Sequence, residues 1–190
     1  TFSGISNTYG YNINADKISL VAISGARLIW DPAAPNNCST NMIEVAGADK
    51  KCVVGAGSQN FIWVEGRFVP GAATSADYGI AFGGVKHSKI RNARVNGAAL
   101  YNILLDWNSL SNSITNVFAI EGAGSGVGIL NASNYNIFRS INAGNNLYKG
   151  IDLTNSHNTG LSQIVATNNG DGSTAWTAGL MSIDSGKSTM

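Results

Sequence analysis

The 190-residue chain has little charge and few cysteines or prolines. Only 12% of its residues are charged, about half the usual share, and 12 Lys and Arg against 11 Asp and Glu leave a net charge of +1. This balance provides no basic excess to hold phosphates, so we do not expect nucleic acid as a partner. No apolar run reaches about 18 residues, and we therefore expect no membrane span.

Signs of a metal, a cofactor or a familiar catalytic motif are also lacking. The sequence has no Gly-x-Ser-x-Gly, no His-Glu-x-x-His, no Gly-x-x-x-x-Gly-Lys and no clustered Cys/His zinc pattern. The Asp and Glu residues are too scattered to indicate a calcium site. Cys38 and Cys52 could pair, although two unpaired thiols are the simpler interpretation. We therefore expect no metal site and no cofactor.

What the chain does contain is one pattern repeated four times. A short apolar set recurs with starts 23, 24 and 24 residues apart, at Ile80-Ala81-Phe82, Ile103-Leu104-Leu105, Val127-Gly128-Ile129 and Ile151-Asp152-Leu153. A second set follows each of these, with apolar residues at offsets 0, 3 and 5, at Ile90-Ala93-Val95, Ile114-Val117-Ala119, Phe138-Ile141-Ala143 and Leu161-Ile164-Ala166. Two sets that share one period indicate a repeat architecture, in which each unit buries its apolar side against its neighbours.

The repeat is built from strands. Each apolar set is short, alternating and bounded by Gly, Asn or Ser, and no repeat has an apolar stripe long enough for a helix of about ten residues. The 23 glycines and the abundant asparagines suit tight bends, because both residue types tolerate positive φ. The sequence therefore predicts an all-β solenoid whose coils stack about 4.8 Å apart.

The repeats resemble the right-handed, single-stranded parallel β-helix of pectate lyase-like enzymes and phage tailspikes. The typical coil of these proteins has a Gly-Ile-x-Leu strand and an Asn-x-x-Ile-x-Asn-Val-x-Ala strand, which Gly150 to Leu153 and Asn112 to Ala119 match. The resemblance implies a single β-helix domain over residues 1–190 with about 24 residues per coil. Since neither Thr1 nor Met190 lies next to an obvious cap for a solenoid, we expect a fragment of a longer chain.

Polar positions recur in register as well. The residue two places after the start of each second set is polar, at Asn92, Asn116, Ser140 and Gln163. These side chains either form a ladder of hydrogen bonds from coil to coil or simply face water. His87 and His157 fall on bends before second strands, where two solvated residues are a simpler interpretation than a catalytic or metal-binding pair.

Hydrolysis of a glycan on this fold would need two carboxylates, one to protonate the leaving oxygen and one to activate water or attack the sugar. Asp106 follows the first strand of its coil, and Asp152 lies in the first strand two coils further on. Two steps of about 4.8 Å put their backbones about 10 Å apart, which side chains can span. Asp106 and Asp152 are therefore the candidate catalytic residues, with ordinary solvent-facing carboxylates as the alternative. Glu121, on a bend, is too far around the coil to join them.

Five further residues are candidates for substrate binding. Trp63, Tyr101 and Trp107 are expected at outward positions or bends, where an aromatic ring can pack on the C–H face of a sugar. Arg91 and Arg139, two coils apart, could hold the carboxylates of an acidic sugar. The alternatives are rings packed under loops or against a neighbouring subunit, and arginines that discourage aggregation of the sheet.

The resemblance favours a phage tailspike-like receptor-binding protein that binds a bacterial surface polysaccharide. Cleavage of this polysaccharide would make it an endo-acting glycoside hydrolase, a depolymerase. The resemblance also implies a homotrimer, with Leu104, Phe118 and Ile120 as outward apolar residues, and a location in the virion tail or otherwise outside cells. Two alternatives stay open: a non-catalytic adhesin or structural fibre segment, and a pectate-type polysaccharide lyase, which the missing acidic cluster disfavours.

Overall fold

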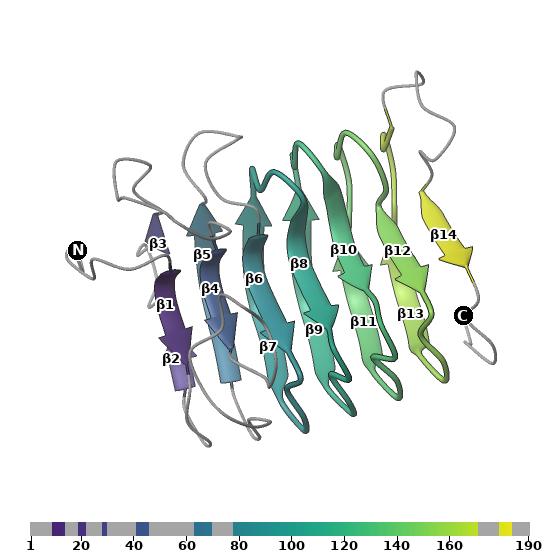
Figure 1. The fold of residues 1–190 in the computed structure, drawn as a ribbon. Helices are drawn as coiled ribbons and strands as arrows, with labels where there is room; N and C mark the ends of the chain where they lie inside the picture. The colour runs from purple at the N-terminus through teal and green to yellow at the C-terminus, as the bar shows by residue number, and fades with distance from the viewer. Residues whose placement is uncertain are drawn as a thin grey trace.

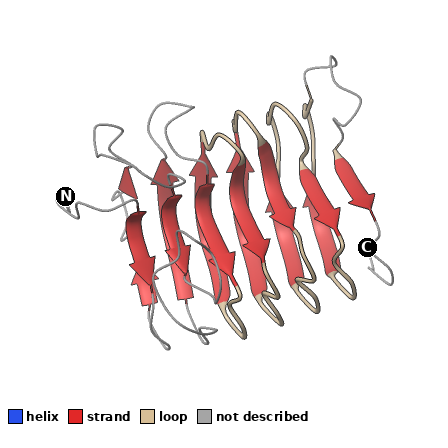
Figure 2. Cartoon of the chain, viewed as in Figure 1, coloured by secondary structure: helices blue, strands red, loops and turns tan. Residues whose placement is uncertain are grey.

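The computed structural model describes residues 78–170 in full, together with residues 179–180 and the backbone of six other strand segments, 9–13, 19–21, 28–29, 41–45, 63–69 and 181–183. Every regular element in these ranges is a strand (Figure 2). Cys38, Cys52 and the proposed ends of the domain lie outside the described residues. The described strands follow one another along a single axis, from β1 to β14 (Figure 1).

The strands form two parallel sheets. The first sheet contains β1 (Tyr9–Ile13), β4 (Asn41–Val45), β6 (Tyr78–Gly83), β8 (Tyr101–Asp106), β10 (Ser125–Ile129), β12 (Ile151–Thr154) and β14 (Leu180–Ile183). The second sheet contains β2 (Ser19–Val21), β5 (Trp63–Val69), β7 (Lys89–Asn96), β9 (Ser113–Ile120), β11 (Ile137–Asn142) and β13 (Gly160–Val165), and β3 (Leu28–Ile29) pairs with β5. From β4 on, consecutive strands alternate between the sheets, so each coil contributes one strand to each.

The register between coils confirms the predicted period. Val127 of β10 pairs with Ile103 of β8 and with Ile151 of β12, each 24 residues away. Ile80 pairs with Ile103 in the same column, so the four apolar sets of the sequence stand one above another. All four residues are fully buried. The chain is therefore a parallel β-solenoid, as the repeat predicted.

A left-handed residue in each second strand explains the offsets 0, 3 and 5. Asn92, Asn116, Ser140 and Gln163 have φ values of 47°, 53°, 56° and 53°. Such a residue interrupts the two-residue alternation, so the inward positions continue at offset 3 instead of offset 2. Side chains at these positions are bonded in pairs from coil to coil, Asn116 Nδ2 to Asn92 Oδ1 at 2.9 Å and Ser140 Oγ to Gln163 Oε1 at 2.6 Å. Both pairs lie on the exposed surface, so these side chains form hydrogen bonds from coil to coil and also face water.

Side-chain amides and hydroxyls hold the corners from inside. At the bend that leads into the second sheet, Ser88 N donates to Asn112 Oδ1, and Asn112 N donates to Asn136 Oδ1, each at 2.9 Å. Ser109 and Ser133 form a parallel column, in which each hydroxyl accepts from the backbone amide of the preceding coil. These buried groups give each bend amide a partner, so the columns fix one coil on the next.

A third buried column crosses the opposite corner, where the chain returns to the first sheet. Asn102 Nδ2 donates to Asn146 Oδ1 at 3.0 Å, and Asn146 Nδ2 donates to Asn169 Oδ1 at 3.0 Å. The corner has no space for a larger residue next to these amides. A Cβ on Gly126 would lie 2.8 Å from Asn146 Nδ2 and 2.6 Å from the Gly150 carbonyl oxygen. The glycine near the start of β10 thus leaves the space that the asparagine of the bend occupies.

Candidate functional site

Asp106 and Asp152 lie on the outer face of the first sheet. Leu104, Gly128 and Asp152 are partners across three coils, and this column alternates with the buried core residues Ile103 and Leu105. Asp106 follows Leu104 by two residues and so points to the same side. Two coil steps of about 4.8 Å and two residues of about 3.3 Å place the two Cα atoms roughly 12 Å apart. That the two carboxylates themselves come within reach of one another stays a prediction.

The Asp152 carboxylate is buried and fully engaged. Its Oδ2 accepts from the Tyr101 hydroxyl at 3.0 Å and pairs with Lys149 Nζ at 2.6 Å, and its Oδ1 accepts from Thr154 Oγ1 at 2.8 Å. The residue is 3% exposed. The buried carboxylate of Asp152 therefore has an ion-pair partner, the ammonium group of Lys149.

The Asp106 carboxylate is fixed at the far end of β8. Its Oδ1 accepts from the backbone amide of Trp107 at 2.8 Å and from Asn131 Nδ2 of the next coil at 2.7 Å. Asp106 is 5% exposed, whereas Trp107, which has a φ of 56°, is 39% exposed. The bend therefore buries the carboxylate and presents the indole to solvent.

Tyr101 joins the coils on this face. A Cβ on Gly128 would lie 2.7 Å from two carbons of the Tyr101 ring and 3.0 Å from Leu104 Cδ1, so the glycine makes room for both side chains. The ring also stacks on Tyr78, with centroids 6.4 Å apart. Burial first, and then the charge and hydrogen bond of Asp152, raise the pKa of the Tyr101 phenol well above its usual value, and Asp106 adds to this effect.

The sequence did not single out Gly128 or Lys149. The signal for Gly128 was present, since a glycine in the middle of an apolar strand set marks a place where another group approaches closely. Lys149 is three residues before Asp152 and belongs to the bend, so its pairing depends on how the bend enters β12.

The remaining candidates lie on the second sheet. Arg91 and Arg139 occupy one outward column, where each pairs with Thr115, and both are exposed. Trp63 starts β5 and is in register with Lys89 of β7, and its side chain is outside the described part of the structure. Because the core lies between the two sheets, outward residues of the second sheet point away from Asp106 and Asp152. The candidate residues whose side chains are described therefore do not gather on one face.

Two of the three residues expected at a subunit interface are not exposed. Leu104 is 2% exposed because it packs over Gly128 beside Tyr101, and Ile120 is 8% exposed at the end of β9. The expectation that they face solvent was wrong. Phe118 is 41% exposed, with the guanidinium of Arg94 5.9 Å from its ring centroid. Among the second-sheet strands whose side chains the structure describes, the large exposed apolar residues are Phe118, Ile137 and Val165.

Other kinds of site find no support in the described residues. His87 and His157 stand on bends before second-sheet strands in different coils, as expected from the sequence, and two other bends lie between them. Within the described ranges, no group of three or more His, Cys, Asp or Glu residues could hold a metal ion. No helix among the described elements is long and apolar enough to cross a membrane.

The fold places this chain in the class of parallel β-solenoids. Comparison with solved structures found one chain of similar fold. No protein-family profile matches the chain, and no curated protein matches it significantly. ORF18 of Geobacillus virus E2 has a similar structure, with a TM-score of 0.68 and 13% sequence identity. The match covers 96% of this chain and 38% of the viral chain. At this identity the similarity establishes the fold alone.

Proposed function

We propose that this chain is part of a viral tail-fibre or tailspike-like protein that binds a bacterial surface polysaccharide. The similarity of fold to ORF18 of Geobacillus virus E2 supports the viral origin. The observation that carries the binding role is the ring of Trp107, which is 39% exposed at the bend directly after the buried carboxylate of Asp106. Aromatic rings pack on sugar C–H faces while neighbouring polar groups bind hydroxyls.

Cleavage of the bound polysaccharide is the second part of the proposal. With Cα atoms roughly 12 Å apart, the two aspartate side chains have to turn toward each other on substrate binding to bring their carboxyl groups into the range of about 6.5–9.5 Å. This separation suits an inverting hydrolysis, in which one carboxylic acid protonates the leaving oxygen and the other carboxylate activates water. Asp152, which pairs with Lys149 Nζ at 2.6 Å, takes the role of the base, and Asp106 takes that of the acid.

A non-catalytic adhesin or fibre segment is the competing function, and one observation favours it. Asp106 and Asp152 are 5% and 3% exposed, and the carboxylate of Asp152 is bound by Tyr101, Lys149 and Thr154. Carboxylates that are buried and paired in this way commonly stabilise a fold without meeting a substrate. In that case the sugar surface consists of Trp107 and its surroundings alone.

Binding and cleavage are separated by measuring both on the same polysaccharides. Purified capsular and O-antigen polysaccharides are tested for binding on an array, and the release of new reducing ends reports cleavage. Trp107→Ala should weaken binding at least tenfold, whereas Phe118→Ala, an equally exposed ring on the other sheet, should leave it unchanged. If neither the parent chain nor any variant binds a polysaccharide, the proposed function is wrong.

The carboxylates are tested one at a time. Asp106→Asn and Asp152→Asn should each abolish cleavage and retain binding if the chain is a hydrolase. Absence of cleavage by the parent chain on every polysaccharide that it binds identifies the adhesin instead. Activity that requires added calcium would indicate the lyase.

A further inference from the structure

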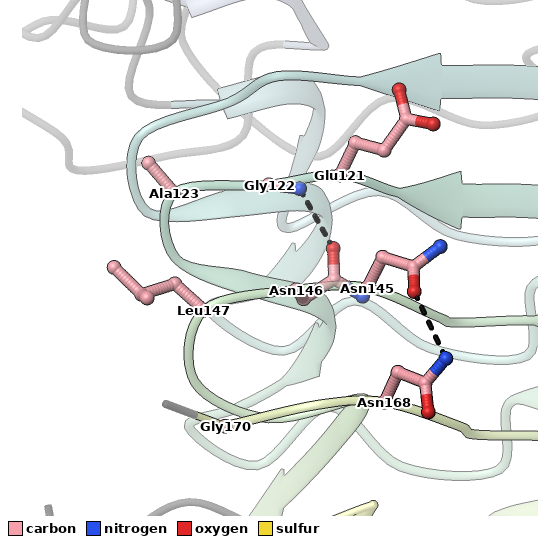
Figure 3. A pocket seen from close by; sticks show the side chains of 8 residues that line it. All are labelled: Glu121, Gly122, Ala123, Asn145, Asn146, Leu147, Asn168 and Gly170. Atoms are coloured by element: carbon pink, nitrogen blue, oxygen red, sulfur yellow. Dashed lines mark hydrogen bonds between the residues drawn. The ribbon is translucent and has the colours of Figure 1, made fainter. Parts of the chain in front are cut away.

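A second concave site lies at the corner where the coils leave the second sheet. It is a shallow pocket of about 450 Å³, a size typical of small-molecule sites. Figure 3 shows its wall of side chains from three successive coils, with Glu121 from one coil, Asn145 and Leu147 from the next, and Asn168 from the third. None of these residues belongs to the face that carries Asp106 and Asp152.

The pocket wall is a column of left-handed residues on a rigid base. Glu121, Asn145 and Asn168 have φ values of 55°, 56° and 52°. Their backbones are bonded from coil to coil, with Glu121 N donating to the Gly144 carbonyl at 3.2 Å and Asn145 N to the Thr167 carbonyl at 3.0 Å. The buried column of Asn146 lies directly behind them. These side chains are therefore held at the spacing of the coils, about 4.8 Å.

The polar groups of the column alternate between acceptor and donor. Asn168 Nδ2 donates to Asn145 Oδ1 at 3.3 Å, and this bond fixes the orientation of the Asn145 amide. The Asn145 NH2 group consequently points toward the side of Glu121 (Figure 3). The pocket thus presents a carboxylate acceptor, an amide donor and an amide oxygen acceptor in sequence. Vicinal hydroxyls of a sugar ring both donate and accept, and they match such a series.

Leu147 supplies an apolar wall. It is 43% exposed and lines the pocket beside the amides. A sugar ring has an apolar C–H face as well as polar edges, and a site that combines a leucine with oriented polar groups can bind both.

Glu121 is the unusual member of its column. Gly97 holds the equivalent place one coil earlier, and asparagine holds it in the two coils that follow, both residue types that favour positive φ. A glutamate here is conformationally unfavourable, and residues in such conformations concentrate at functional sites. Within the described part of the chain, its carboxylate has no hydrogen-bond or ion-pair partner of its own.

We propose that this pocket binds one neutral sugar unit of a polysaccharide through Glu121, Asn145 and Leu147. The inference rests on the proposed polysaccharide-binding function and adds a second contact point, at a corner instead of on a sheet face. Because Glu121 is the charged residue among the described residues that line the pocket, an acidic sugar such as a uronate is repelled. The site is therefore specific for sugars without a carboxylate.

The test uses the isotope-labelled chain and four free sugars: glucose, galactose, N-acetylglucosamine and glucuronate. Saturable NMR shifts of the Gly122, Asn145 and Gly170 amides are expected with at least one neutral sugar and not with glucuronate. Asn145→Ala should abolish these shifts. The matched control is Asn116→Ala, another exposed asparagine with a φ of 53° and an asparagine neighbour, and it should leave them intact.

Two variants of Glu121 separate recognition from folding. Glu121→Gln keeps the shape and should admit glucuronate. Glu121→Asn should raise the melting temperature, since asparagine suits the backbone, and should weaken sugar binding at the same time. A variant that raises stability cannot lose binding through unfolding.

The outcomes also distinguish this site from the proposed function. Absence of pocket shifts with every neutral sugar, or equal shifts in Asn145→Ala and in the parent chain, overturns the pocket even if polysaccharides bind on the array. Pocket shifts without array binding support the pocket as a sugar site and refute the polysaccharide function. Glucuronate shifts in the parent chain contradict the stated specificity.

Discussion

Asn146 makes four hydrogen bonds with one buried side-chain amide. Its Oδ1 accepts from Gly122 N and Asn102 Nδ2, each at 3.0 Å, and its Nδ2 donates to the Ala119 carbonyl at 3.1 Å and to Asn169 Oδ1 at 3.0 Å. The backbone groups of the corner cannot satisfy each other where the chain turns, so the side chain takes their place. Individual asparagines therefore act as structural parts of the bend.

Asn146→Ala should lower the free energy of unfolding by about 3 kcal/mol, because it leaves a buried N–H and a buried carbonyl without partners. Asn142→Ala is the control, since Asn142 lies on the outward side of β11 and should change stability by no more than about 0.5 kcal/mol. Urea unfolding followed by circular dichroism measures both. Equal effects of the two substitutions would contradict the structural role of the column.

Tyr101 makes stability depend on pH in the alkaline range. Its pKa in the folded chain is raised above the ordinary value of 10.0 by burial and by Asp152. Above pH 10 the unfolded chain therefore loses the phenolic proton while the folded chain keeps it, and stability falls as the pH rises. Below pH 10 the phenol is neutral in both states and contributes no slope.

Tyr101→Phe should remove this contribution to the alkaline decline. The comparison of unfolding midpoints for the parent chain and the variant between pH 8 and pH 11 isolates Tyr101 from other titrating groups, since these are common to both. Parallel curves for the two proteins would show that Tyr101 titrates alike in the folded and unfolded chains.

Strand β10 shows how closely each element fits its neighbours. Gly126, near its start, has the Gly150 carbonyl, Asn146 Nδ2 and the Ala119 carbonyl within 2.6–2.9 Å of the place that a Cβ would take. Gly160, which begins β13, has Ile137 Cγ1 at 3.9 Å as the nearest such neighbour. An alanine in place of Gly126 would therefore overlap neighbouring atoms, whereas an alanine in place of Gly160 would make an ordinary van der Waals contact.

Gly126→Ala should destabilise the chain by about 2 kcal/mol or more through overpacking. Gly160→Ala should be nearly neutral, because a contact near 3.9 Å needs no rearrangement. Thermal unfolding of the two single variants measures the difference. A smaller loss for Gly126→Ala than for Gly160→Ala would mean that the corner opens more readily than its geometry indicates.

The strands were predictable from the sequence to a greater extent than the site. The recurrence of Ile80, Ile103, Val127 and Ile151 is a direct consequence of stacking, so the period revealed the fold. Placement of Asp106 and Asp152 on one face followed from the same register. Their burial did not follow, because it depends on the Tyr101 ring lying over Gly128 and on Lys149 reaching back from a bend. Long-range contacts between side chains leave no period in the sequence.

Arg91 and Arg139 show another limit of the sequence. Their positions in the repeat identified an outward column correctly, and both are exposed. The repeat does not show whether outward residues of the two sheets lie near each other. In the structure, the outward face of the second sheet points away from the carboxylates of the first. Leu104 shows that an outward position in the repeat need not be exposed. Its side chain points away from the core but is buried beside Tyr101.

The described strands form a linear stack in which strands pair with those of adjacent coils, in both sheets. A few side chains reach one coil further, such as Tyr101, whose hydroxyl donates to Asp152. In such a stack, stability is approximately a sum of coil terms and neighbour terms. The strand pairing of its neighbours therefore keeps the same register when one complete coil is removed.

Deletion of residues 127–150, one coil of 24 residues, would join Gly126 to Ile151. Ile151 would then pair with Ile103 in the place that Val127 holds now. The shortened chain should fold with the same circular dichroism spectrum and a lower melting temperature. Deletion of residues 127–138 is the control, because half a coil sends first-sheet sequence into the second sheet. If the half-coil deletion folds as well as the full one, the coil is not the unit of the structure.

The direction of the hydrogen bonds has a mechanical consequence. Strand pairing in both sheets and all three buried columns of Asn and Ser connect one coil to the next, so they run along the long axis of the molecule. A pull on the two ends is shared by every bond that crosses the same level and must break them together. A sideways force at one edge breaks them singly, so this rod resists tension far better than it resists peeling.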